Sequence, residues 1–410
     1  GWPDKTPDLA YFYPTDVLVT AYDIIFFWVA RMIFSGMEHT KQIPFHTVFI
    51  HGLVRDAQGR KMSKSLGNGI DPLEMIETYG ADALRLNMVM GNSPGNDMRF
   101  YVERCEAMRN FANKIWNASR FLMMHLTIEK NELPEHLEIE DKWVLTQLSS
   151  LIPEVTDNIE KFELGIAAGK IYDFIWNSYC DWYIELAKTR LTQEDGDSAI
   201  RAQQVLCYVL TETLKLLHPF MPFITEEIWQ ALPHEGNTLM ASSWPVQDPE
   251  LLFPAEAADM ERVMDIIRAV RSRRAEMNVP PSRKARLIIV TQNGNAYRQC
   301  EAFISRLGYA SQIEIQTDGP SSTDGMVTTV TPDAQLFLPL NELVDLEIER
   351  KRIEKEMKKA KTDLDVLDKK LGNPSFLSKA PERVISAERE RAEKLKSLLA
   401  GLEERAHQMK

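Results

Sequence analysis

The sequence of 410 residues has few cysteines and no apolar run long enough to span a bilayer. Its cysteines are far apart and form no Cys-x-x-Cys pair, so we predict reduced thiols, with neither a zinc site nor a disulfide framework. The longest apolar run, residues 24–34, is interrupted by Arg31, and no signal peptide precedes it. We therefore expect a cytoplasmic protein with no metal site and no membrane contact. The cysteines are Cys105, Cys180, Cys207 and Cys300.

An excess of positive charge is also absent. The formal net charge of −12 excludes a uniformly basic nucleic-acid-binding protein and restricts any RNA contact to local patches. One patch is residues 351–410, with 16 Lys or Arg against 11 Asp or Glu, a net of +5 that leaves −17 for residues 1–350. Another is residues 261–286, with eight basic and three acidic residues. Each could face a phosphate backbone, and for the second an ordinary solvated face is an equal alternative.

The stretch that carries chemistry is residues 46–68. A short apolar strand pattern and a turn lead into Lys61-Met62-Ser63-Lys64-Ser65, and we call residues 61–68 the lysine loop. Two lysines beside small and glycine residues can form a mobile cationic loop that closes over a polyphosphate. Such ammonium groups would stabilise the charge that appears as pyrophosphate leaves a nucleoside triphosphate, so the pattern indicates nucleotidyl transfer. The alternative, a solvated basic turn, is what a lone pair of lysines usually is.

This pentapeptide resembles the signature loop of class I aminoacyl-tRNA synthetases. The resemblance implies that Lys61 and Lys64 hold the β- and γ-phosphates of ATP, which enters with Mg²⁺, while an amino-acid carboxylate attacks the α-phosphate in line. It also implies that the backbone just before the loop lies against the adenine. The ATP-binding residues implied in this way are Gly52, Leu53, Val54, Lys61, Met62, Ser63, Lys64 and Ser65.

A second segment points to an amino-acid pocket. A helix that opens directly after a strand places its first residues at the carboxyl end of a sheet, where open α/β folds bind ligands. Taken alone, Ile24 and Trp28 would be core residues on one helix face and Asp23 an N-cap. However, residues 22–28, Tyr-Asp-Ile-Ile-Phe-Phe-Trp, resemble the valyl-tRNA synthetase family. That resemblance implies that Asp23 meets the amino-acid end of the adenylate, while Ile24 and Trp28 form the wall of a pocket sized for valine.

The hydrophobic pattern changes along the chain, whose length suits about two to four domains. A strand at residues 16–20, a helix at 24–37 and a strand at 48–50 predict a βαβ crossover of a Rossmann-type sheet. If this sheet has lost its first half, its first strand should show an unpaired edge or pair with another copy of the chain. Residues 101–232 carry long amphipathic patterns, typical of a bundle of about four or five helices. A helix at 260–277 and three strand-like runs predict a small α/β module. Those runs are residues 287–291, 312–316 and 335–338.

The last 70 residues have a heptad pattern that predicts two long helices in an antiparallel coiled coil, broken at Gly372-Asn373-Pro374. A dimerisation or spacer coil is the alternative to an arm that contacts RNA. The heptad positions, apolar except for one, are Leu343, Leu346, Arg350, Ile353, Met357, Ala360, Leu364, Leu367 and Leu371. The second helix is marked by Val384, Leu395, Leu398 and Leu402.

The resemblance to class Ia synthetases extends over essentially the whole chain. It implies a multidomain α/β plus all-α protein: a partial Rossmann-type parallel sheet, stem-contact helices, a helical anticodon-binding bundle, a small α/β module and a C-terminal antiparallel coiled coil. Residues 218–227 resemble a piece of the anticodon bundle. The implied domains are 1–60, the second Rossmann half; 61–100, the lysine loop and stem-contact region; 101–240, the anticodon-binding domain; 241–340, a linker and α/β module; and 341–410, a tRNA-binding arm.

The function implied is that of part of a valine–tRNA ligase, which activates valine with ATP to valyl-adenylate and transfers it to tRNA(Val). The partners would be ATP, valine and tRNA(Val), and the full-length protein a monomer. An isoleucyl enzyme is one alternative, but it would require a cysteine-rich zinc end where the arm lies. A non-catalytic tRNA-binding or scaffolding protein that kept the lysine loop is another. The chain departs from the family pattern because it has no His-Ile-Gly-His-type motif and no editing domain.

This departure yields a prediction about the 410-residue chain by itself. We expect it to bind ATP and tRNA weakly and not to aminoacylate, because the adenine-binding histidine motif is missing. Valine-dependent exchange of pyrophosphate into ATP is the measurement, and exchange above the level without valine would contradict the expectation.

Overall fold

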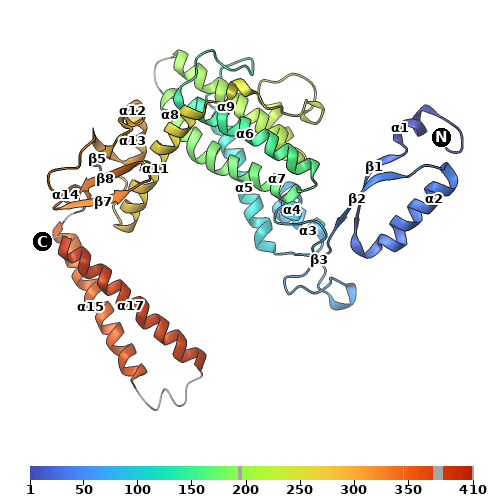
Figure 1. Ribbon diagram of the computed structural model, residues 1–410. Helices are drawn as coiled ribbons and strands as arrows, with labels where there is room; N and C mark the ends of the chain where they lie inside the picture. The colour runs from blue at the N-terminus through green and yellow to red at the C-terminus, as the bar shows by residue number, and fades with distance from the viewer. Residues whose placement is uncertain (193–195, 345, 373–381, 409–410) are drawn as a thin grey trace. The chain divides into compact units, whose positions relative to one another are not determined.

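The computed structural model describes residues 1–192, 196–344, 346–372 and 382–408 (Figure 1). It is a mixed helical and α/β structure with small sheets, and the chain forms two compact units, Gly1–Ala257 and Ala258–Lys410. Among the described helices, none is both long and apolar enough to cross a membrane. The same residues contain no group of three or more His, Cys, Asp or Glu side chains arranged to hold a metal ion.

The first unit begins with the predicted βαβ crossover. After helix α1 (Pro7–Phe12), strand β1 (Thr15–Ala21) pairs in parallel with β2 (Phe45–His51), and helix α2 (Ala30–Thr40) connects them. Both strand predictions are therefore confirmed. Because these two strands form a two-stranded sheet, β1 has β2 as its one neighbour among the described strands, and the other edge of β1 is unpaired, as predicted.

The connection between β1 and α2 differs from the single helix expected at residues 24–37. It consists of a 3₁₀ turn, η1 (Tyr22–Ile24), and a π-helical turn, η2 (Ile25–Val29), before regular α-helix begins. The N-cap of η1 is Ala21, so Asp23 lies inside the turn and the N-cap interpretation is wrong. Trp28 is 58% exposed and is not a core residue, because a two-stranded sheet provides no second layer to cover it.

A second short pair of strands adjoins the lysine loop. Strand β3 (Val54–Arg55) pairs in parallel with β4 (Met98–Arg99), and between them lie a 3₁₀ turn, η3 (Lys64–Leu66), and helices α3 (Pro72–Tyr79) and α4 (Ala81–Val89). Asp71 caps α3, since its carboxylate accepts a hydrogen bond of 2.8 Å from the amide of Leu73. Gly80, at a φ of +93° that suits glycine, separates α3 from α4.

The largest part of the first unit is a bundle of helices. The predicted amphipathic pattern is confirmed in its first helix, where Phe111, Ile115 and Leu122 are all buried. Tyr179 and Tyr183 are buried as well, so these two aromatic residues belong to the core. Residues 164–191 are helical throughout but have a π-helical middle, η4. The elements are α5 (Val102–Met123), α6 (Ile139–Glu160), α7 (Leu164–Asp173), η4 (Phe174–Tyr183), α8 (Ile184–Leu191), α9 (Gly196–Leu217) and α10 (Pro222–Gln230).

Two side chains of α4 fix the start of α10. The carboxylate of Asp82 accepts hydrogen bonds from the backbone amides of Phe223 (3.2 Å) and Ile224 (2.7 Å), which otherwise lack helical partners. Arg85 donates to the carbonyl oxygens of Phe220 (3.3 Å) and Pro219 (3.0 Å). The helices that follow the lysine loop are thereby joined to the bundle.

The second unit contains a four-stranded mixed sheet with the order β6-β5-β8-β7. Three of its strands match the predicted runs, whereas β7 was not predicted. Helices α12, α13 and α14, each of eight residues or fewer, were not predicted either. The elements are the end of α11 (Pro254–Glu276), β5 (Ala285–Thr291), α12 (Gly294–Gln299), α13 (Glu301–Gly308), β6 (Ala310–Gln316), β7 (Met326–Val330), β8 (Ala334–Pro339) and α14 (Leu340–Leu343).

Arginines of the predicted basic patch at 261–286 are engaged inside this unit. Arg268 forms an ion pair with Asp265 (2.8 Å) and Arg273 with Glu276 (3.0 Å). The guanidinium of Arg274 is buried and donates to the carbonyl oxygen of Pro280 (3.1 Å). These contacts favour the interpretation of this segment as an internally paired surface, not as a free phosphate-binding patch.

The chain ends in two long helices, α15 (Leu346–Leu371) and α17 (Glu382–Gln408), which lie side by side (Figure 1). The buried residues of their shared face are seven apart on each helix: Ala360 and Leu367, and Ala392 and Leu399. Leu398 was expected on the apolar face, but it is 51% exposed, because the next residue, Leu399, lies on the face toward α15. Helix α15 ends where the Gly-Asn-Pro break was predicted. The side chains of Leu346, Arg350, Ile353 and Leu402, and all of Asn373 and Pro374, lie outside the described residues.

A buried charge cluster joins α6 to α8 in the bundle core. The guanidinium Nη1 of Arg190 lies 3.0 Å from Glu140 Oε1 and 2.8 Å from Asp141 Oδ1, and Tyr183 donates to the same Asp141 oxygen at 2.7 Å. One cation thus serves two buried carboxylates. Burial, followed by the negative charge of Asp141, raises the pKa of Glu140 to about 7.

This cluster predicts a pH dependence of stability. Because the pKa of Glu140 is raised above its ordinary value of 4.5, the folded state favours the protonated form, and stability is lost as the pH rises through about 7. We expect Glu140→Gln to remove this loss, which is about 1–3 kcal/mol. The measurement is the thermal unfolding midpoint at about pH 5 and about pH 8, with Glu135→Gln on the surface as control. An equal pH dependence in all three proteins would contradict the assignment.

Candidate functional site

The structure brings two of the predicted site residues together. The ammonium Nζ of Lys61 lies 3.8 Å from Oδ2 of Asp23, although the two residues come from different predicted binding sets. Both side chains are partly exposed, at 69% and 37%, so the pair is accessible to solvent and weak as a stabilising interaction. Ile24 is half-buried in the same turn as Asp23, and Trp28 follows on the π-helical turn. The lysine predicted to bind phosphate therefore lies beside the segment predicted to bind the amino acid.

The lysine loop is a compact turn with its charges outside. Lys61 bridges to Arg55 of β3, which attaches the start of the loop to a strand. Within the loop, Oγ of Ser63 accepts a hydrogen bond from the amide of Leu66 (3.3 Å) and lies 3.1 Å from Oγ of Ser65. Lys61, Lys64 and Ser65 are exposed, while Met62 and Ser63 are half-buried. Such a loop presents two ammonium groups to solvent from a backbone that is already folded.

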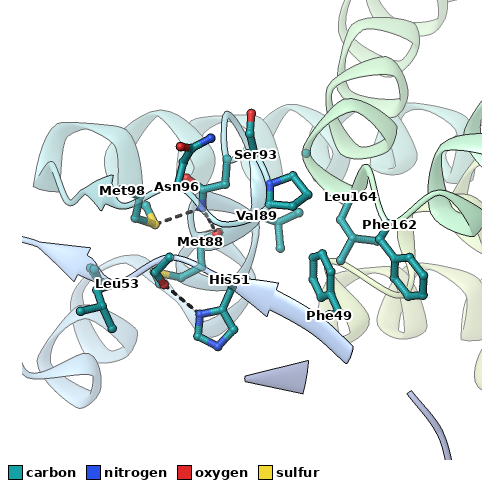
Figure 2. A pocket seen from close by; sticks show the side chains of 15 residues that line it. Phe49, His51, Leu53, Met88, Val89, Ser93, Asn96, Met98, Phe162 and Leu164 are labelled. Atoms are coloured by element: carbon teal, nitrogen blue, oxygen red, sulfur yellow. Dashed lines mark hydrogen bonds between the residues drawn. The ribbon is translucent and has the colours of Figure 1, made fainter. Parts of the chain in front are cut away.

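The predicted adenine-contacting backbone, Gly52 to Val54, lines a cavity of about 460 Å³ (Figure 2). Glycine is required at residue 52, because a Cβ atom there would lie 1.9 Å from the carbonyl oxygen of Asn96. At the other side of the cavity Phe49 of β2 stacks on Phe162, with ring centroids 5.3 Å apart. The remaining lining residues are His51, Met88, Val89, Asn92, Ser93, Pro94, Met98, Leu164 and Gly165.

Asp97 is a residue of this site that the sequence did not reveal. Its carboxylate accepts hydrogen bonds from the backbone amide of Leu53 (2.7 Å), the hydroxyl of Tyr22 (3.2 Å) and the guanidinium of Arg55. The amide of Leu53, followed by Arg55, lowers the pKa of Asp97, so the group is ionised at neutral pH. One carboxylate therefore ties the strand before the lysine loop to the turn that carries Asp23. The only local signal was an acidic residue after a Gly-Asn pair.

Three family models match this chain. Residues 1–101 match "tRNA synthetases class I (I, L, M and V)", residues 141–289 match "Anticodon-binding domain of tRNA ligase", and residues 345–410 match "Valyl tRNA synthetase tRNA binding arm". The valine–tRNA ligase of Clostridium acetobutylicum is 51% identical over 415 residues, which is 100% of this chain and 47% of the relative. That of Clostridium tetani is 52% identical over 414 residues, with the same shares.

Along its whole length the chain is similar to part of the valine–tRNA ligases. It spans about half the length of the curated family members that it matches. Among solved structures, methionyl-tRNA synthetase of Mycobacterium tuberculosis with methionyl-adenylate is similar, with a TM-score of 0.48 and 22% identity over 56% of this chain and 46% of that one. The match of residues 345–410 to the valyl arm favours the valyl interpretation over the isoleucyl alternative.

The Asp97 contacts predict a local change on substitution. In Asp97→Ala the amide of Leu53 loses its acceptor, so we expect its hydrogen exchange to accelerate at least about tenfold. Ser93→Ala in the same loop is the matched control and should leave the exchange unchanged. Equal exchange of the Leu53 amide in the two variants would show that Asp97 does not hold this strand.

Proposed function

We propose that this chain supplies three parts of a valine–tRNA ligase: the ATP-phosphate loop, part of the valine pocket and the tRNA-binding domains. The observation that carries the proposal is the 3.8 Å approach of Lys61 to Asp23, inside a chain that matches valine–tRNA ligases along its whole length. Adenylate formation requires the amino acid and the triphosphate at one place, and these residues provide an anionic and a cationic group there. The full-length ligase would act as a monomer in the cytoplasm.

Each proposed role follows from the charge and position of the residue. ATP enters as its magnesium complex, with the adenine against Gly52, Leu53 and Val54. Lys61 and Lys64 hold the β- and γ-phosphates and stabilise the charge that develops as pyrophosphate leaves. The hydroxyl groups and backbone of the loop support this contact.

The carboxylate of Asp23 meets the amino-acid end of the adenylate, where an α-ammonium group is its natural partner. Ile24 and Trp28 form the wall for the valine side chain, and a branched residue at position 24 leaves little room for a longer substrate. The indole of Trp28 is exposed and is therefore available for contact with the valine side chain.

The rest of the chain would bind tRNA(Val). Residues 61–100 would combine the loop with a stem-contact region after the Rossmann half at 1–60, and residues 101–240 would form the anticodon-binding bundle. Residues 241–340 would serve as linker and α/β module. Helices α15 and α17 would form the antiparallel coiled coil of an arm at 341–410, and its exposed basic residues suit a phosphate backbone.

The two lysines give the direct test. In the full-length ligase that carries this segment, we expect Lys61→Met and Lys64→Met each to lower kcat for valine-dependent pyrophosphate exchange on the order of 100-fold, because each removes charge from the departing pyrophosphate. Lys41→Met is the control, since Lys41 is an exposed lysine paired with Glu38 on the surface. If exchange persists at the control rate in both variants, the proposed role of the loop is wrong.

A further inference from the structure

The side chain of Asn68, the last residue of the lysine loop, contacts the start of the loop and Asp56 before it. Its amide nitrogen Nδ2 donates to the carbonyl oxygen of Lys61 (3.3 Å) and to Oδ2 of Asp56 (2.9 Å). Its amide oxygen Oδ1 accepts from the backbone amide of Ser63 (3.0 Å). An asparagine amide can donate and accept at once, so one side chain holds the backbone before and after Met62.

Asp56 is held in place by its own hydrogen bonds and anchors this contact. Its side chain is buried and accepts hydrogen bonds from the amides of Gln58 (3.1 Å) and Arg60 (2.7 Å), and Arg60 Nε adds an ion pair at 2.7 Å. The Asn68 amide, followed by the contacts of Arg60, lowers the pKa of Asp56 to about 2. The carboxylate is therefore ionised at neutral pH and accepts several strong hydrogen bonds.

These bonds close the lysine loop on itself. Lys61 is joined to β3 at Arg55, and Asn68 at the far end of the loop returns to Lys61 and Ser63. Gly67, with a φ of +59°, makes the turn that allows this return, and its amide contacts the carbonyl oxygen of Lys64 at 3.3 Å. Both lysines thus project from one hydrogen-bonded ring.

We infer that Asn68 is the positioning residue of the lysine loop: through Asp56 it fixes the backbone from which Lys61 and Lys64 reach the phosphates, so that the loop moves as one body. We call its contacts to Asp56, Lys61 and Ser63 the Asn68 clasp. The inference rests on the proposed function for its effect on ATP, but the clasp itself is a property of this chain. Preorganised charges stabilise a transition state at lower cost than charges that must first be ordered.

Limited trypsin digestion of the 410-residue chain tests the clasp without any substrate. Trypsin cuts after Arg60, Lys61 and Lys64, and a backbone must open locally before it is cut. We expect Asn68→Ala to accelerate cleavage at these three positions about tenfold, while cleavage after Lys41 is unchanged. Leu66→Ala is the matched control, since the Leu66 side chain is 60% exposed and lies in the same loop. Equal cleavage rates in the two variants would overturn the clasp.

Pyrophosphate exchange in the full-length ligase tests the positioning role. We expect Asn68→Ala to lower kcat about tenfold or more while KM for valine stays within about twofold, because the valine pocket is untouched. Asn68→Asp should be more severe, since it places a second carboxylate beside Asp56 and beside the phosphate-binding loop. Lys41→Met, an exposed lysine outside the loop, should retain the unaltered rate.

The two assays separate the inference from the proposed function. Faster cleavage with a lower kcat in Asn68→Ala supports the positioning role. Faster cleavage with an unchanged kcat overturns it, because the ring would then be unnecessary for catalysis. Absence of exchange in the unaltered full-length protein would count against the proposed function, while the cleavage rates would still decide whether Asn68 holds the loop.

Discussion

Asp97 is the point at which three segments of the first unit meet: its own loop, residues 53–55 and the turn at Tyr22. Its carboxylate accepts hydrogen bonds from the amide of Leu53, from the guanidinium of Arg55 in β3 and from the hydroxyl of Tyr22. Each of these elements is short, and β3 and β4 have two residues apiece, so regular strand pairing alone would not fix them. An ionised acceptor with several donors supplies the missing constraint. Lys61 and Asp23 extend from the segments that Asp97 ties, since Asp23 follows Tyr22 and Lys61 pairs with Arg55.

A small number of polar contacts also joins the region after the lysine loop to the helical bundle. Helix α4 follows the loop, and its Asp82 and Arg85 hold opposite kinds of backbone groups at the start of α10. Amides bind the carboxylate and carbonyls bind the guanidinium, so neither group is buried without partners. This contact gives the residue 218–227 motif a structural reason: its backbone is the surface on which α4 is fixed. A shift of the start of α10 would therefore also move α4, because these contacts join the two helices directly.

The sequence predicted the features whose signals are local. The strands β1 and β2 and the amphipathic pattern of the bundle, as in α5, each depend on neighbours within a few residues. The lysine loop was found because its spacing is specific. At the level of the family, the comparisons confirm the interpretation drawn from residues 61–65 and 22–28.

What the sequence did not predict depends on partners far along the chain or on small changes of helical period. Asp97 acts on residues 42 and 75 positions away, which no local pattern records. The π-helical turn at Ile25–Val29 lies in the connection between β1 and α2, and Trp28 on this turn is exposed, which the local pattern did not indicate. In the last helix the buried positions pass through Ala392, because contact with α15 selects the face and a small residue fits there as well as a leucine.

The ten-residue π-helical segment η4 determines which face of α8 points into the bundle. A π-helix has more residues in each turn than an α-helix, so each residue of η4 turns the chain through a smaller angle before α8 begins. Removing one residue there would turn α8 by about 100° about its axis. Arg190 would then leave Glu140 and Asp141, and two carboxylates would remain enclosed without their counter-ion. The length of this segment is therefore fixed by electrostatics in the bundle core as much as by its own packing.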